Sequence, residues 1–196
     1  MFSRSRIVEL FKRHWSNVLF IIVIATLVFN PDAKAWVLRQ LFSIGLFKAD
    51  IPSGETTSST SYDLSFKDEN GQQFSTSSLK GKIIFINFWA TWCPPCRAEM
   101  PSINELYKDL GKDPRFVFLM VDADDDLQNS KAFMTKNKFD LPVHTSTGPI
   151  PPALYGGTLP TTIILGKDGQ LLSKHEGIAN YNSENFRKKM IEMASK

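Results

Sequence analysis

Cysteine is scarce in this chain, whose 196 residues contain only Cys93 and Cys96. Domains that rely on disulfides for stability are short and rich in cysteine, so this chain does not belong to that class. Hydrophobic residues make up 42% of the sequence, which is enough for an ordinary core. A bridge between such close positions also removes little loop entropy, and a purely structural disulfide is disfavoured. Three interpretations of the pair remain: half of a metal site, a redox-active dithiol, or a nucleophile with its helper.

Histidine is also scarce, and the three that are present, His14, His144 and His175, are scattered along the chain. A zinc or copper site would have to recruit them from distant positions. The acidic residues between Asp122 and Asp126 lack the glycine and the distant glutamate of an EF-hand loop. The end of a strand followed by the N-terminus of a helix explains them better. We therefore expect no bound metal.

Basic charge is not in excess over most of the chain. The first thirteen residues carry four basic side chains and one acidic side chain, and beyond them 19 of the 23 basic and 19 of the 20 acidic residues remain. This balance leaves no basic face for nucleic acid, and the sequence has no DNA- or RNA-binding motif. We expect no nucleic-acid partner, and the basic N-terminus needs a local explanation.

A long apolar run is missing as well. The stretch "VLFIIVIATLVF" has twelve residues, fewer than the roughly twenty of a membrane span, and suits the core of a signal peptide. The small residues Ala33 and Ala35 fit a cleavage site. Against cleavage, the preceding basic region is long and contains Glu9. Trp15 and Trp36 also bracket the stretch as interfacial anchors would. We favour an uncleaved membrane anchor, with a cleaved signal peptide as the alternative.

The N-terminal third is accordingly divided into three segments. Residues 1–14 are predicted to be a basic cytoplasmic N-terminus, residues 15–35 the anchor, and residues 36–61 an amphipathic segment with a flexible linker. We expect the amphipathic part to lie on the membrane surface, and the alternative is a helix packed against the main domain. Cations ahead of the span predict a single-pass protein of the bacterial cytoplasmic membrane, with the rest of the chain outside the cytoplasm. The lipid bilayer is then one partner.

Residues 62–196 have the pattern of an α/β domain. Asn70-Gly71 predicts a β-hairpin, and the apolar run at residues 82–90 predicts a strand buried on both faces. A helix ending at Gly111, a second buried strand and a second helix follow. A strand, a turn at Asp168-Gly169, another strand and a last helix complete the domain. This order predicts a layered fold with a mixed β-sheet flanked by helices.

The cysteines follow the buried strand at its carboxyl end, the edge where open α/β sheets carry out chemistry. If Cys93 is the N-cap of the next helix and Cys96 its third residue, the helix dipole favours the thiolate form of Cys93. Cys96, one turn further on, is then the resolving thiol. Pro94 and Pro95 occupy the first two helical positions, where a missing N–H is tolerated. The pattern therefore indicates a redox dithiol.

The stretch "FWATWCPPCRAEMP" resembles the thioredoxin superfamily, and specifically its membrane-tethered thiol–disulfide oxidoreductases of the TlpA, ResA and CcmG type. The likeness runs from about residue 62 to the C-terminus, and the early hairpin and "GTLPTT" at residues 157–162 agree with it. It implies a thioredoxin-like fold with a cis peptide bond before Pro160, facing the disulfide. The residue before it, Leu159, would offer its backbone to the substrate. Trp92, Pro94 and Pro95 are the other expected substrate contacts.

Glu99 lies one helical turn after Cys96, where a carboxylate can relay protons. The resemblance implies that this acid takes part in catalysis, and the alternative is a solvent-facing carboxylate of the helix. In either case we expect the position to lie near the surface. Thioredoxins proper have a buried aspartate where this chain has Asn87, an amide that cannot titrate. That departure strengthens Glu99 as the proton carrier.

The expected function is a membrane-anchored thiol–disulfide oxidoreductase that reduces protein disulfides outside the cytoplasm. A membrane thiol relay would supply the electrons, and the Cys93–Cys96 disulfide would serve without a bound cofactor. Two alternatives share the fold. Copper chaperones of this fold space their cysteines three apart and add a histidine ligand. Peroxidases need one peroxidatic cysteine in a different local setting.

Overall fold

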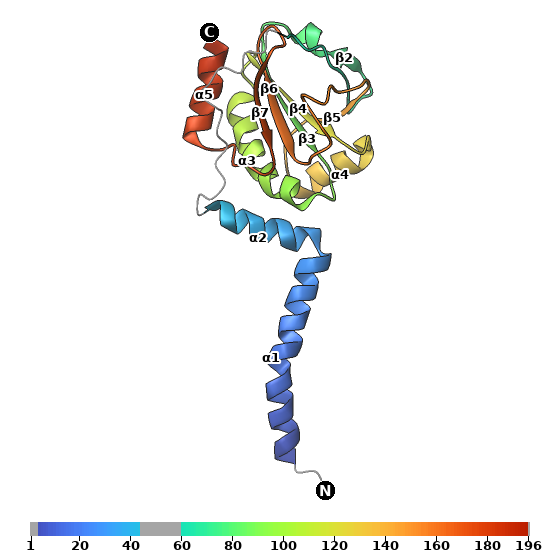
Figure 1. Ribbon diagram of the computed structural model, residues 1–196, viewed down its shortest axis with the longest axis vertical. Helices are drawn as coiled ribbons and strands as arrows, with labels where there is room; N and C mark the ends of the chain where they lie inside the picture. The colour runs from blue at the N-terminus through green and yellow to red at the C-terminus, as the bar shows by residue number, and fades with distance from the viewer. Residues whose placement is uncertain (1–3, 44–59, 196) are drawn as a thin grey trace.

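The protein is described here by a computed structural model that covers residues 4–43 and 60–195 of the chain (Figure 1). An α/β domain is built from residue 60 onward, and two helices precede it. Most of the predicted linker, and the end of the predicted amphipathic segment, lie outside the described residues.

The domain is organised around one mixed sheet with the strand order β2-β1-β5-β4-β3-β6-β7. Its strands are β1 (Ser65–Asp68), β2 (Gln73–Ser75), β3 (Ile83–Trp89), β4 (Phe116–Asp122), β5 (Val143–Ser146), β6 (Thr161–Leu165) and β7 (Leu171–Glu176). Strands β3, β4 and β5 are parallel, and the other pairings are antiparallel. The mixed sheet and the β1–β2 hairpin are therefore confirmed. Gly71 in the hairpin turn has a φ of +83°, a conformation that favours glycine.

The helices of the domain are the 3-10 helix η1 (Thr76–Leu79) and the α-helices α3 (Pro94–Leu110), α4 (Leu127–Asn137) and α5 (Glu184–Ser195). Side chains of β3 alternate between two apolar clusters, as expected for a strand buried on both faces. Phe85 belongs to the cluster that includes residues of α3, α4 and α5, whereas Ile86 belongs to the cluster on the opposite face of the sheet. This arrangement points the odd-numbered residues of β3, including Asn87, toward the helix that carries the cysteines.

Strand β5 was not expected from the sequence. Its residues Val143, His144, Thr145 and Ser146 form a short, mostly polar run, which the pattern of apolar residues does not identify as a strand. Three of the four are nevertheless buried, because β5 pairs with β4 on one side and with β1 on the other. Tertiary pairing, which no local pattern encodes, makes this segment a strand.

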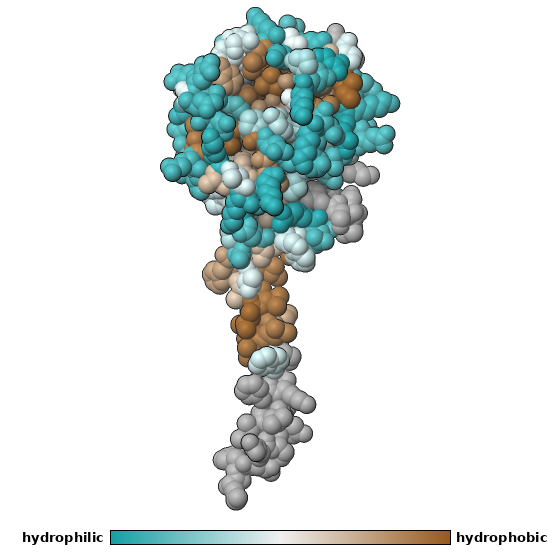
Figure 2. Space-filling view, turned by 180° about the vertical axis from the view of Figure 1, so that it is seen from behind, coloured by the Kyte–Doolittle hydropathy of each residue, from teal (hydrophilic) through white to brown (hydrophobic). Residues whose placement is uncertain are grey.

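The two N-terminal helices are α1 (Arg4–Phe29) and α2 (Pro31–Ser43). They break at Asn30, and their axes bend by 93° between Asn17–Phe29 and Pro31–Leu41. The bend falls inside the predicted anchor at residues 15–35. Among the described residues, no single helix meets the length and hydropathy of a membrane span, but this bent pair does so in combination. Figure 2 shows the apolar band on α1, whose exposed members include Phe20, Ile21 and Phe29.

Helix α2 packs against α3 at the end of the domain where α3 begins (Figure 1). The side chain of Ala35 is 2% exposed, and Asp32 forms an ion pair with Arg97, the residue after Cys96. The described part of the amphipathic segment thus packs on the main domain, which was the alternative to the expected position on the membrane surface, although Trp36 stays exposed. The helix also starts at Pro31, five residues before the predicted segment.

Candidate active site

The two cysteines form a disulfide at the N-terminus of α3, with an S–S distance of 2.06 Å. Cys93 is the N-cap, and Pro94 and Pro95 are the first two helical residues, as predicted. Because the prolines have no N–H, Cys96 carries the first backbone donor of the helix, which reaches Cys93 Sγ at 3.3 Å. This donor and the helix dipole both stabilise negative charge on Cys93 when the disulfide is reduced.

Strand β6 brings a second segment to the cysteines. It runs antiparallel to β3 with Phe88 opposite Thr161, so the start of β6 lies beside the end of β3 that leads into the Cys93 turn. The Leu159–Pro160 peptide bond immediately before β6 is cis, as the resemblance implied. Leu159 is half-buried and contacts both apolar clusters.

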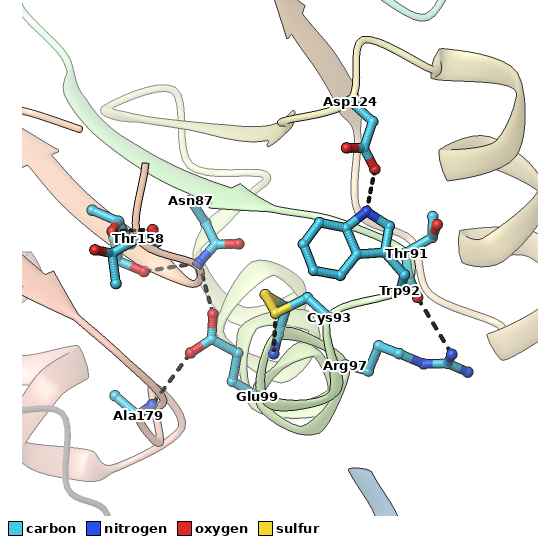
Figure 3. Close-up of a disulfide and its surroundings, with 12 residues drawn as sticks. Asn87, Thr91, Trp92, Cys93, Arg97, Glu99, Asp124, Thr158 and Ala179 are labelled. Atoms are coloured by element: carbon cyan, nitrogen blue, oxygen red, sulfur yellow. Dashed lines mark hydrogen bonds between the residues drawn. A yellow bond between two sulfur atoms is a disulfide. The ribbon is translucent and has the colours of Figure 1, made fainter. Parts of the chain in front are cut away.

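Trp92 lies beside the disulfide in Figure 3 and is 59% exposed. Its indole Nε1 donates to Asp124 Oδ2 at 2.6 Å, which ties this large side chain to the loop after β4 (Figure 3). The loop also contains Asp126, which caps α4 by accepting from the backbone N–H of Asn129 at 3.0 Å. The acidic residues thus end a strand, cap a helix and hold Trp92, and the contact to Trp92 was not foreseen.

Glu99 is fully buried, with 0% of its surface exposed, so the expectation of a position near the surface was wrong. Its place in α3 explains the burial, because Ile103 and Leu106, four and seven residues on, lie on the same buried stripe. Figure 3 shows the carboxyl group on the opposite side of the disulfide from Trp92, between Asn87 and Ala179. Burial raises the pKa of Glu99 to about 8, despite the hydrogen bonds from these two residues. The fold thus places a buried carboxyl group with a raised pKa on the helix that carries the disulfide.

The partners of Glu99 come from three different elements. Asn87 Nδ2, on β3, donates to Glu99 Oε1 at 2.8 Å and to Thr162 Oγ1, on β6, at 2.9 Å. The backbone N–H of Ala179, in the segment before α5, donates to Glu99 Oε2 at 3.2 Å. Tyr181 is fully buried nearby, and burial together with the charge of Glu99 raises its pKa well above the ordinary value. The sequence identified Glu99 and noted Asn87, but it missed Thr162 and Ala179. The sheet register brings Thr162 to Asn87, and the path of the chain after β7 brings Ala179 to Glu99.

No group of three or more His, Cys, Asp or Glu side chains arranged to hold a metal ion occurs within residues 4–43 and 60–195. His144 lies on β5, where burial lowers its pKa to about 4. His175 lies on β7, opposite Thr162. The groups described at the disulfide are the two sulfur atoms, the buried carboxyl group of Glu99 and the exposed indole of Trp92.

Comparison with known proteins supports this interpretation. The family described as Redoxin matches residues 50–189. The chain belongs to the redoxin family. Among curated relatives, "Thiol-disulfide oxidoreductase ResA" of Bacillus thuringiensis (strain Al Hakam) is 37% identical over 55% of this chain and 62% of its own length. The protein of the same name from Geobacillus thermodenitrificans is 33% identical over 79% of this chain and 82% of its own length.

A solved structure agrees with this fold. A thiol:disulfide interchange protein of Chlorobium tepidum superposes with a TM-score of 0.58 at 27% identity, over 74% of this chain and 99% of that one. The thioredoxin-like α/β fold is thereby confirmed. The chain spans about three fifths of the length of the first curated relatives that it matches.

Proposed function

We propose that this protein is a thiol–disulfide oxidoreductase that reduces disulfides of protein substrates outside the cytoplasm. The observation that supports this proposal most directly is the Cys93–Cys96 disulfide at the start of α3, with the buried Glu99 carboxyl group on the same helix. The names of the ResA relatives and the family match support the same chemistry. No observation favours a copper chaperone or a peroxidase. A copper chaperone of this fold would need a further histidine ligand, and a peroxidase would need a cysteine in a different local setting.

The reaction proceeds in two exchanges. In the reduced protein, the Cys93 thiolate attacks one sulfur of a substrate disulfide, forms a mixed disulfide and expels the other substrate sulfur as a thiolate. Cys96 then loses its proton and attacks Cys93 Sγ, which releases the second substrate sulfur and closes the Cys93–Cys96 disulfide. Two electrons pass from the dithiol to the substrate. A thiol relay in the membrane is the proposed electron donor, and the redox-active disulfide needs no further cofactor.

Glu99 is the proposed acceptor of the Cys96 proton. A buried thiol gives up its proton reluctantly, and Cys96 is 0% exposed. With a pKa of about 8, Glu99 can both take up and release a proton near neutral pH. Trp92, Pro94, Pro95, Leu159 and Pro160 are proposed to contact the substrate around Cys93.

The N-terminal helices are proposed to hold the domain at the cytoplasmic membrane. The apolar residues 18–29 of α1 would enter the bilayer, with the basic residues ahead of them on the cytoplasmic side. Cleavage after Ala35 would remove both Asp32 and Ala35, which contact the domain, so an uncleaved anchor keeps the observed packing.

The test is to capture the intermediate. In cells that express the full chain with Cys96→Ala, we expect protein adducts linked through Cys93 that a reductant releases. The matched Cys93→Ala variant should capture nothing, because the attacking sulfur is gone. Mass spectrometry of the released proteins would identify the substrates. Adducts in equal amount with both variants, or with neither, would contradict the assigned roles.

A further inference from the structure

Asn87 has an unusual hydrogen-bond arrangement for a buried amide. Both hydrogen bonds described for its side chain are donated by Nδ2, one to Glu99 and one to Thr162. Its oxygen Oδ1 is buried and has no hydrogen-bond partner among the described residues. The residue is 0% exposed, so bulk water does not reach this oxygen. A buried acceptor without a partner costs free energy, and here it lies on the residue that contacts the proton carrier.

The surroundings of Glu99 fit its ionised form. Oε1 faces the Asn87 amide hydrogens and Oε2 faces the Ala179 N–H, so each carboxyl oxygen meets a donor. A protonated carboxyl group carries an O–H that must instead find an acceptor. If the proton sits on Oε1, it points at an amide group that also donates. The observed arrangement therefore accommodates the carboxylate and conflicts with the acid.

Rotation of the Asn87 amide removes this conflict. Half a turn about the Cβ–Cγ bond exchanges Oδ1 and Nδ2, which are nearly equal in size, and places Oδ1 next to Glu99 Oε1. The protonated carboxyl group can then donate to Oδ1. Thr162 accommodates either orientation, because a hydroxyl group accepts from Nδ2 before the rotation and donates to Oδ1 after it. No backbone movement is needed.

We propose that Asn87 is a positioning residue for the thiol–disulfide reaction, whose amide donates to the Glu99 carboxylate and turns over to accept from Glu99 when the carboxyl group is protonated. This proposal rests on the proposed function, in which Glu99 takes the Cys96 proton. When Glu99 is ionised, the Asn87 oxygen has no hydrogen-bond partner among the residues that the structure describes. When Glu99 is protonated and the amide has rotated, the Asn87 NH2 group has none. Unpaired buried donors are rarer in proteins than under-used carbonyl oxygens, so Asn87 favours the carboxylate and keeps a proton acceptor ready.

The titratable groups near Glu99 do not set its protonation state in the oxidised protein, so the hydrogen bond with the Asn87 amide can be tested alone. Among the described residues, these groups are Tyr181, from the segment before α5, and the two cysteines, whose disulfide lies beside Glu99 in Figure 3. Tyr181 keeps its proton because its pKa is raised well above the ordinary value. The cysteines do not titrate while they are joined in the disulfide. In the oxidised protein, Glu99 is thus the group in this cluster that exchanges a proton near neutral pH.

The test measures Glu99 and Asn87 directly in the full-length oxidised protein. Carbon NMR of labelled glutamate gives the Glu99 titration in the parent and in Asn87→Leu. Loss of a hydrogen bond to a charged group should raise the midpoint by about one pH unit or more, roughly a tenfold change in proton affinity. The matched control is Asn104→Leu. Asn104 is a buried asparagine of α3 whose Oδ1 accepts from the N–H of Asp140, in the segment between α4 and β5, at 2.8 Å. The control should lower stability and leave the midpoint in place.

The second measurement follows the amide itself. The side-chain NH2 resonances of Asn87 should shift with the same midpoint as Glu99 in the parent protein, and the shift should vanish in Glu99→Gln. An unchanged Glu99 midpoint in Asn87→Leu, or NH2 resonances that ignore the Glu99 titration, would overturn the proposal. If Asn87→Leu does not fold, the titration of the parent protein decides. If Glu99→Gln reduces disulfides at the parent rate while the two groups titrate together, the hydrogen-bond switch stands and the catalytic role of Glu99 falls.

Discussion

At the scale of single residues, the fold makes Glu99 costly to ionise. Its pKa is about 8 in the folded protein, against 4.5 for an ordinary glutamate. The folded state therefore binds more protons than the unfolded state between these two values. The resulting stabilisation is fully present below about pH 4.5 and is lost as the pH rises through about 8. His144 acts in the opposite direction, since burial lowers its pKa from 6.5 to about 4 and stability falls as this histidine is protonated.

Glu99→Gln should remove the pH dependence that Glu99 contributes. Relative to the variant, the parent protein should lose on the order of 3–5 kcal/mol of unfolding free energy between pH 5 and pH 9. Urea unfolding of the oxidised proteins measures this, and comparison with the variant cancels the contribution of His144. Glu105→Gln is the matched control, because Glu105 is an exposed carboxylate of the same helix. Parallel pH curves for the parent and Glu99→Gln would show that Glu99 is already ionised at pH 5.

The same substitution tests the kinetic role. Glu99→Gln should slow disulfide reduction by roughly one to three orders of magnitude, the scale of a lost acid–base group, and Glu105→Gln should not. Stopped-flow measurement of Cys93–Cys96 disulfide formation separates this effect from the first attack, which Cys93 makes without Glu99. If turnover in Glu99→Gln equals that of the parent, water is the base for Cys96.

At the scale of elements, the sequence predicted the parts of the site that are local. The Cys93 cap, the two helical prolines and the hairpin at Gly71 follow from residue types at fixed spacing. The burial of Glu99 was not predicted, although its spacing from Ile103 and Leu106 places it on the buried stripe of the helix. Its contact with Ala179 depends on the path of the chain after β7, which no local pattern contains. Long-range pairing of strands is likewise what makes β5 a strand.

The contact between α2 and α3 is testable at this scale. Ala35→Glu would place a charge in a contact where the side chain is 2% exposed, so α2 should separate from α3. Hydrogen–deuterium exchange of the full-length protein in lipid nanodiscs should then become faster across Pro31–Leu41. Lys34→Glu introduces the same residue at the neighbouring exposed position and should leave exchange nearly unchanged. Equal exchange in the two variants would mean that Ala35 does not hold α2 to the domain.

At the scale of the whole molecule, charge and hydropathy are distributed unevenly. The net charge of +3 arises from the basic residues of the first thirteen positions, and the exposed apolar side chains of α1 follow directly (Figure 2). Exposed side chains such as Phe20, Ile21 and Ile22 would remain in water if α1 had no apolar surroundings. Beyond these first thirteen positions, basic and acidic residues are equal in number, and the α/β domain buries its apolar residues in two clusters. The two parts are thus built for different environments.

This division predicts the topology of the protein in a bacterial cell. An alkaline phosphatase fused after residue 50 should be active, because cations ahead of an apolar segment stay in the cytoplasm and the following chain crosses the membrane. A fluorescent protein that matures only in the cytoplasm, fused at the same point, should stay dark. Replacing Arg4, Arg6, Lys12 and Arg13 with glutamate should weaken or reverse both signals, since the charge difference across the segment is then lost. The intact mass of the membrane-bound protein tells an anchor from a signal peptide, because cleavage after Ala35 would remove the first 35 residues. An inactive alkaline phosphatase fusion together with a bright fluorescent-protein fusion would place the dithiol inside the cell, where protein disulfides are rare substrates.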